Sequence, residues 1–307
     1  MFLTVAKVML PVLVAVQLGQ ELGLVDMVGR AIAPAMALMH LPPEAGIIWA
    51  ATVLTGIYGG IASLSGLSPS LDLTAAQVSA LCAMMLFSHA IPVEQAIVRR
   101  AGAAFSTTAA LRIGAALFYG AAVSWICHLT GTLSEPMSFE WLRGSSVLAS
   151  QADSGWLAWV LSTAFSLALT LAVIIVLVLL LDAMDKLGIT RRITAATMPL
   201  LRMSGLAPEV APVTTVGVLL GLTYGGALII EEAKKQNFSP RTRFLALSWL
   251  SLSHSLIEDT LLMLALGADI WVVLVGRVLL TLAIVAALAR LTARGRWRGD
   301  EISQQHI

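Results

Sequence analysis

Ser88-His89-Ala90-Ile91-Pro92-Val93-Glu94 returns 165 residues later as Ser253-His254-Ser255-Leu256-Ile257-Glu258-Asp259. Both stretches lie late in apolar segments, and both combine a serine, a histidine and an acid. Two arginines follow at the same spacing, Arg112 and Arg277, each deep in an apolar run. Ionisable side chains are costly in hydrocarbon and are rarely incidental there. A duplicated membrane unit that carries a duplicated polar cluster predicts a transporter-type site between two repeats.

The composition indicates an integral membrane protein. The mean hydropathy is +0.88, 58% of the 307 residues are hydrophobic and only 12% are charged. Basic stretches flank apolar segments, which argues against nucleic acid as a partner. Cys82 and Cys127 lie in apolar runs without a ligand motif, so we expect no disulfide, no metal site and no cofactor.

Eight apolar segments have close to the roughly 20 residues that a membrane helix needs. They are 3–20, 45–65, 76–97, 104–128, 155–181, 209–230, 243–263 and 269–291. If all eight cross, nine Lys and Arg residues lie inside and seven outside, which hardly obeys the positive-inside rule. If 45–65 and 209–230 are re-entrant hairpins, fourteen are cytoplasmic and only Arg30 and Arg143 lie outside. We therefore predict an all-α membrane protein of a bacterial inner membrane, with six crossing helices, two re-entrant hairpins and both termini cytoplasmic.

Glycine clusters at the centres of these two segments support the hairpins. They read Thr55-Gly56-Ile57-Tyr58-Gly59-Gly60 and Gly221-Leu222-Thr223-Tyr224-Gly225-Gly226. Glycine permits a tight reversal, and half of a 22-residue segment reaches about 16 Å, near the bilayer midplane. The expected tip residues are Gly56, Tyr58, Gly59, Gly60, Gly221, Tyr224, Gly225 and Gly226. The alternative is a full helix whose small residues allow close packing.

Each half then contains a crossing helix, an amphipathic surface helix (25–40 or 189–204), a hairpin and two more crossings. Three crossings per half is an odd number, so the second copy is inverted relative to the first. The predicted organisation is a first repeat over 1–130, a periplasmic linker over 131–154, a second, inverted repeat over 155–292 and a cytoplasmic tail over 293–307. Trp49 and Trp141 are candidate interface anchors.

Seven side chains are candidate ligands for a substrate or ion. They are Ser88, His89, Glu94, Ser253, His254, Glu258 and Asp259. Pro92 breaks or kinks the first helix, and non-helical backbone at membrane depth persists only when it is buried in protein or lines a wet cavity. The second copy has no proline at that place, so its break is less firmly indicated. The alternative is that each histidine is satisfied by a neighbouring helix.

Arg112 and Arg277 lie eighteen residues beyond Glu94 and Asp259, on the next helix of each repeat. A turn between antiparallel helices brings each arginine towards its acid. Two interpretations stay open here, a structural ion pair that fixes helix register and a role in pairing with the substrate.

Several motifs together resemble the Gate-domain membrane proteins, a family also labelled nucleoside recognition. These motifs are Leu41-Pro42-Pro43-Glu44 or Leu206-Ala207-Pro208-Glu209, the Tyr-Gly-Gly segments and the Ser-His-x-x-x-x-acid stretches. The resemblance covers roughly 20–115 and 185–285. It implies inverted repeats whose hairpins meet near mid-membrane, as in the nucleoside and ferrous-iron transporters of the family. This chain lacks the GTP-binding domain of the iron transporters, and no set of nucleoside contacts can be matched residue by residue.

The sequence thus predicts a permease for a small polar solute, coupled to a proton or sodium gradient. Its partners are the lipid bilayer, the solute and H⁺ or Na⁺, and homo-oligomer formation is left open. One alternative is a membrane assembly protein, as the spore-maturation members of the family suggest. An intramembrane enzyme acting on lipid is a third interpretation. Because the chain has no catalytic motif, we expect that it is not an enzyme.

Overall fold

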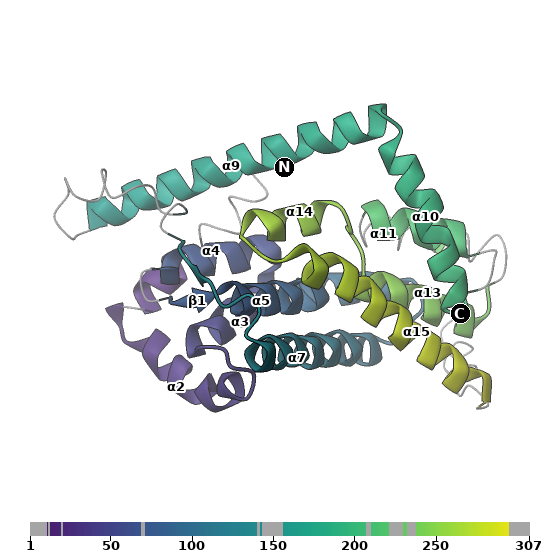
Figure 1. Ribbon diagram of the computed structural model, residues 1–307, viewed down its shortest axis with the longest axis horizontal. Helices are drawn as coiled ribbons and strands as arrows, with labels where there is room; N and C mark the ends of the chain where they lie inside the picture. The colour runs from purple at the N-terminus through teal and green to yellow at the C-terminus, as the bar shows by residue number, and fades with distance from the viewer. Residues whose placement is uncertain are drawn as a thin grey trace.

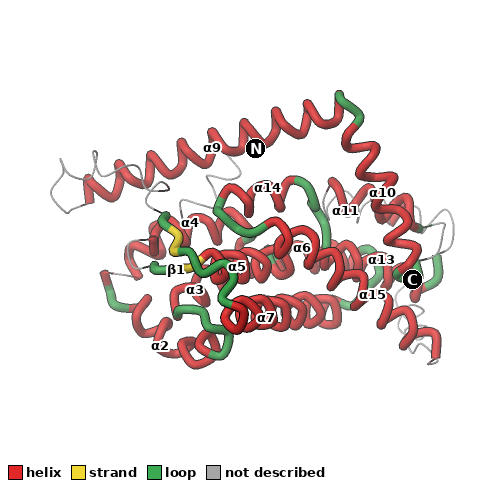
Figure 2. Tube along the Cα trace, in the orientation of Figure 1, coloured by secondary structure: helices red, strands yellow, loops and turns green. Residues whose placement is uncertain are grey.

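The computed structural model describes residues 11, 13–19, 21–68, 71–139, 142, 156–206, 210–220, 230–231 and 238–294. Helices make up nearly all of this part (Figure 2). Within it, β1 (Leu73–Thr74) and β2 (Pro136–Met137) form a short antiparallel pair. This pair holds the segment around Pro136 beside Ala75, where the next helix begins.

The first half contains the helices that build one side of the core. They are α2 (Leu24–Ala37), α3 (Pro43–Thr55), α4 (Ile57–Leu67), α5 (Ala75–Ser88), α6 (Ile91–Arg100) and α7 (Phe105–Thr130). Pro43 occupies the first turn of α3, where its missing N–H costs nothing. Thr74 and Gln77 form a capping box that begins α5. Helices α5 and α7 lie side by side, with α5 in the middle of the molecule and α7 below it in the view of Figure 1.

The second half is also helical in the part that the structure describes. Its elements are α9 (Trp156–Lys186), α10 (Ile189–Met203), α11 (Ala211–Leu220), α13 (Pro240–Leu252), α14 (Glu258–Ala265), the π-helix η3 (Trp271–Gly276) and α15 (Arg277–Arg294). The helices expected over 25–40 and 189–204 are found as α2 and α10. Helix α9 runs along one edge of the molecule, at the top of Figure 1, and α10 turns down from its end.

Three helical stretches in the described part are long and apolar enough to cross a membrane. They are Ala75–Arg100, Phe105–Thr130 and Trp271–Ala293. Helix α9 has 31 residues, which is about 46 Å at 1.5 Å per residue and exceeds a hydrocarbon core of about 30 Å. The protein is therefore a helical membrane protein.

Segment 45–65 is not one straight helix, because α3 and α4 are separated at Gly56. Gly56 has φ 102° and ψ −179°, a conformation that L side chains rarely adopt. The chain then folds back on itself: a Cβ at Gly60 would collide with the side chain of Thr52. These two residues would lie about 12 Å apart along a straight helix. The corresponding glycines of the second segment, Gly221, Gly225 and Gly226, lie outside the described residues, as does Tyr224.

The helices that carry the two histidines are broken at equivalent places. Helix α5 ends at Ser88 and α6 begins at Ile91, while α13 ends at Leu252 and α14 begins at Glu258. Ala90 and Ser255, 165 residues apart, take left-handed backbone conformations with φ of 47° and 48°. The second break therefore forms although its sequence has no proline.

Candidate functional site

Two buried arginines hold the broken segments in place. Arg112 donates from Nε to the carbonyl oxygen of Phe87 (2.7 Å) and from Nη2 to that of His89 (2.9 Å). Arg277 makes the same contacts in the second half, to Leu252 (3.2 Å) and His254 (3.1 Å). Both arginines are 0% exposed. Broken helices leave carbonyl oxygens without N–H partners, and the guanidinium fork supplies the missing donors.

The two histidines meet at the centre of the molecule. Nδ1 of His89 lies 3.1 Å from the carbonyl oxygen of Met85, and Nδ1 of His254 lies 2.8 Å from that of Leu250. Because a carbonyl oxygen only accepts, each Nδ1 carries a proton. The two Nε2 atoms lie 2.9 Å apart. The two unwound segments thus contact each other directly.

The first half of this centre is fully bonded. Glu94 Oε2 lies 2.5 Å from Arg112 Nη1, and Glu94 Oε1 lies 3.2 Å from Nε2 of both histidines. Ser88 Oγ accepts a hydrogen bond from Trp49 Nε1 (2.8 Å) and donates one to the carbonyl oxygen of Met84 (2.7 Å). Trp49, a candidate interface anchor, positions Ser88 through this hydrogen bond.

The second half of the centre is open. Asp259 makes no ion pair with Arg277 within 4.0 Å, and its described ionic contact is to His89 Nε2 at 3.9 Å. Asp259 Oδ2, Arg277 Nη1 and Ser253 Oγ are buried without a hydrogen-bond partner. Each such group costs about 1–3 kcal/mol. These three unpaired atoms have no counterpart at Ser88, Glu94 and Arg112.

The two breaks also differ in length. Helix α6 begins one residue after the left-handed Ala90, because Pro92 has its φ preset for the first turn. Helix α14 begins three residues after Ser255. Glu94 and Asp259 each lie four residues after the left-handed residue and donate their N–H to its carbonyl oxygen, but Glu94 is the fourth residue of α6 whereas Asp259 is the second residue of α14.

The bend between α3 and α4 reaches the same region. A Cβ built at Gly56 would lie 3.6 Å from the Cβ of Ala90, and the Ala90 N–H donates to the carbonyl oxygen of Thr52 (3.0 Å). Tyr58 lies within electrostatic reach of Asp259 and of the half-buried Glu258. In the second half the Leu256 N–H donates to the carbonyl oxygen of Val218 in α11 (2.9 Å).

A π-helical turn directly precedes Arg277. The Tyr119 hydroxyl donates to the carbonyl oxygen of Val272 in η3 (2.9 Å), and it contacts Gly276 so closely that a Cβ there would collide with it. Such turns are frequent at functional sites. Tyr119 was not predicted, because it is one aromatic residue among many in an apolar helix and no motif marks it.

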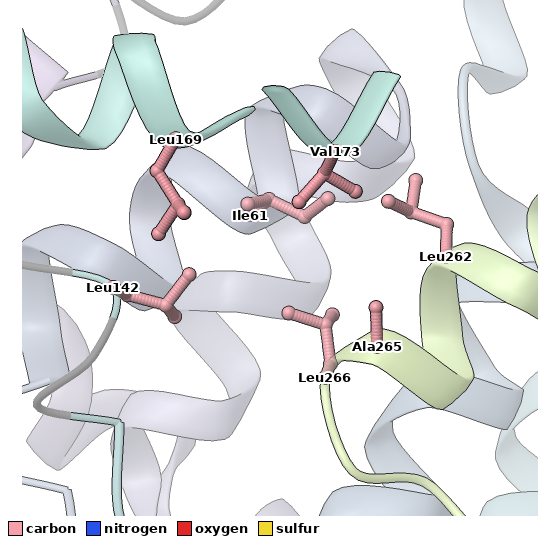
Figure 3. A pocket seen from close by; sticks show the side chains of 7 residues that line it. All are labelled: Ile61, Leu142, Leu169, Val173, Leu262, Ala265 and Leu266. Carbon is pink, nitrogen blue, oxygen red and sulfur yellow. The ribbon is translucent and has the colours of Figure 1, made fainter. Parts of the chain in front are cut away.

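A pocket elsewhere in the described part has a different character. Aliphatic side chains line it, among them Ile61 of α4, Leu169 of α9 and Leu262 of α14 (Figure 3). None of the serine, histidine or acidic residues of the centre borders it. A pocket of this kind suits hydrocarbon rather than a polar ligand.

Comparison with known proteins agrees with the membrane fold. Residues 2–104 match the Gate family model, described as nucleoside recognition. The resemblance to Gate-domain membrane proteins is thus confirmed for the first part of the chain. Over almost its whole length the chain is similar to a protein of Bacillus subtilis (strain 168) described as uncharacterized membrane protein YvoD. The two are 28% identical over 305 residues, which cover 99% of this chain and 95% of that protein. No solved structure matches the chain.

Proposed function

We propose that this protein is a transporter for a small polar solute in a bacterial inner membrane. The observation that carries the proposal is the open half of the centre, where Ser253, Asp259 and Arg277 each present an unpaired buried atom. Native proteins pair nearly all such groups. Eight other buried side-chain atoms of the described residues also lack partners, but these three belong to the second serine, histidine and acid stretch and to its arginine. A solute that supplies the missing partners would explain why these three are unpaired, and the Gate match supports a role in membrane transport.

The three unpaired groups define the chemistry of that solute. Arg277 Nη1 donates, the Asp259 carboxyl group accepts when ionised and also donates when protonated, and the Ser253 hydroxyl does either. The solute therefore carries both hydrogen-bond donors and acceptors. Glu94 and Arg112 are already paired, so they act as the fixed part of the site.

The proposed mechanism places two inverted halves around this centre. Equivalent breaks at Ala90 and Ser255 support the duplication, and the distribution of Lys and Arg supports re-entrant hairpins with both termini cytoplasmic. Rocking of one half against the other would then expose the centre to each side of the membrane in turn. A proton or sodium gradient is the proposed energy source, because the centre is rich in ionisable groups.

Transport by purified protein tests the proposal. A thermal-stabilisation screen against nucleosides, amino acids and organic anions selects a solute, whose uptake is then measured in proteoliposomes. We expect Asp259→Asn and Ser253→Ala to reduce uptake more than about tenfold, because ~1.4 kcal/mol lost from binding is a tenfold effect. The control is Asp182→Asn, which changes an exposed acid paired with Lys186.

Two results would count against it. Normal uptake by Asp259→Asn would remove the solute site, and loss of folded protein in both site variants would favour a packing role in a membrane assembly protein. Uptake that is indifferent to both pH and sodium gradients would remove the coupling.

A further inference from the structure

We infer that the contact between His89 and His254 is a binding site for one divalent transition-metal ion of the Zn²⁺ type. The ligands are Nε2 of both histidines and a carboxylate oxygen of Asp259, with Glu94 Oε1 as the fourth. The inference deepens the proposed function, on which it rests for the ion's role in transport. Ion binding itself is measurable in the absence of transport.

Because each histidine is protonated at Nδ1, the lone pairs of the two Nε2 atoms point towards each other. Each Nδ1 is committed as a donor to a backbone carbonyl oxygen, of Met85 or of Leu250. In the neutral rings both Nε2 atoms are therefore acceptors. They lie 2.9 Å apart, which is repulsive unless a positive charge lies between them.

Four separations among these ligand atoms are close to those of a tetrahedral ion. They are 2.9 Å between the two Nε2 atoms, 3.2 Å from Glu94 Oε1 to each of them, and 3.9 Å from His89 Nε2 to Asp259 Oδ2. Tetrahedral Zn²⁺ with bonds of about 2.0–2.1 Å places its ligands about 3.3–3.4 Å apart. The ligand atoms of His89, His254 and Asp259 all lie within 4.8 Å of one another. The two histidines and Glu94 Oε1 are already near this spacing, whereas Asp259 would have to move closer to the other ligands to complete the geometry.

The surroundings of these ligands are those of metal sites. Metal-binding histidines almost always donate their other ring N–H to a carbonyl or carboxylate, which fixes the ring and its tautomer. Both histidines do so. Ligating carboxylates are in turn hydrogen-bonded, as Glu94 is to Arg112. His89, His254 and Asp259 are 5%, 2% and 9% exposed, so bulk water does not compete freely.

A metal ion explains more of the centre than a proton or sodium does. One proton shared by the two Nε2 atoms leaves Asp259 Oδ2 unpaired. Sodium takes oxygen ligands, whereas imidazole suits zinc, copper, iron and nickel. The two carboxylates offset the charge of the ion. The charges of Arg112 and Arg277 oppose it, and the carbonyl oxygens that they bind offset part of this effect.

The sequence did not predict this site, and we expected none. The ligands come from two stretches 165 residues apart, with one histidine in each. Metal motifs are recognised by short spacings within one segment. Here the two ligand sets come together only because the halves pack with their breaks in contact.

Metal binding by the purified full-length protein tests the inference. Protein in detergent is stripped with EDTA, dialysed against Zn²⁺ or Co²⁺, and assayed for metal content. We expect about one ion per chain, with Co²⁺ absorption bands typical of tetrahedral coordination. His89→Ala, His254→Ala and Asp259→Asn should each weaken binding by more than about tenfold, a loss at the lower end of what changes around metal ligands cause. The matched control is His128→Ala, an exposed histidine that stacks on His40 away from the centre.

Asp259→Asn keeps the test valid if the histidine variants fail to fold, because Asp259 has little bonding to lose. Wild-type protein that binds no Zn²⁺ or Co²⁺, or binding that survives in Asp259→Asn and in a folded His254→Ala, would overturn the inference. Ion binding without any solute uptake would instead count against the transporter. Uptake without ion binding would keep the transporter and remove the metal site.

Discussion

Arg277 holds the main-chain carbonyl of His254 in the same way that Arg112 holds that of His89. The donor is Nη2 in both, at 3.1 and 2.9 Å. Each Nε donates to the carbonyl two residues earlier in the chain. A broken helix in a membrane needs substitute donors for the carbonyl oxygens that lose their N–H partners. Here a fully buried arginine supplies these donors at each of the two breaks.

Arg112→Met should destabilise the protein strongly. It removes three hydrogen bonds and leaves Glu94 as an uncompensated buried charge, a change that costs about 3–5 kcal/mol. Thermal or denaturant unfolding in detergent measures the effect. Arg100→Met, at an exposed position in the last turn of α6, should cost less than about 1 kcal/mol. Equal effects of the two substitutions would show that the buried contacts contribute nothing.

Neutralising the two equivalent acids should have opposite consequences for stability and function. Glu94→Gln weakens the contact to Arg112 and should cost about 2–3 kcal/mol of unfolding free energy. Asp259→Asn removes a charge that has no hydrogen bond at Oδ2, so stability should change by less than about 1 kcal/mol or rise. Unfolding curves for both variants, recorded with their uptake, separate the two roles. A larger loss of stability in Asp259→Asn than in Glu94→Gln would contradict this assignment.

Gly59→Ala should be destabilising where Gly114→Ala is not. A Cβ at Gly59 would lie 2.9 Å from the Cβ of Thr55, so rotation of the threonine does not relieve the clash. Overpacking of this kind costs about 1–3 kcal/mol. Gly114 is in the interior of α7 with nothing within 4 Å of an added Cβ, so alanine there should stabilise by about 0.5–1 kcal/mol. Similar melting temperatures for the two variants would show that the bend near Gly56 tolerates extra volume.

The proposed inversion makes Asp72 periplasmic and Glu231 cytoplasmic. Both residues are exposed, and the native Cys82 and Cys127 are buried, so wild-type protein serves as the unlabelled control. A membrane-impermeant maleimide added to intact spheroplasts should label Asp72→Cys. It should label Glu231→Cys only after the membrane is permeabilised. Labelling of both from the same side would rule out the inverted arrangement.

The repeat in the sequence predicted much of what lies in the core. The offset that links the two serine, histidine and acid stretches also links the helix breaks at Ala90 and Ser255. The eighteen-residue spacing predicted that each arginine approaches its acid, and Arg112 does contact Glu94. The apolar segments predicted the helices well, because a long apolar run in a bilayer has few alternatives to helical structure.

The asymmetry of the centre was not predictable from the same pattern. Asp259 and Arg277 match their counterparts in spacing, yet they do not pair. Spacing along the chain places each acid near its arginine, but it does not fix the side-chain conformations that decide whether the two groups make contact. The contact between His89 and His254 depends on how the halves pack, which spacing along the chain does not encode.

Arg112 and Arg277 differ in how many of their side-chain nitrogens lack a hydrogen bond. Arg112 uses all three of its nitrogens, whereas Arg277 keeps Nη1 unbonded. The arginine of the first half thus has all its donor nitrogens occupied, whereas the arginine of the second half keeps one nitrogen free to bind a ligand. A dimer of two identical half-length polypeptides could not reproduce this difference between the two arginines. A dimer of first halves would have two copies of Arg112 with every nitrogen bonded. A dimer of second halves would have two copies of Asp259 without an arginine partner.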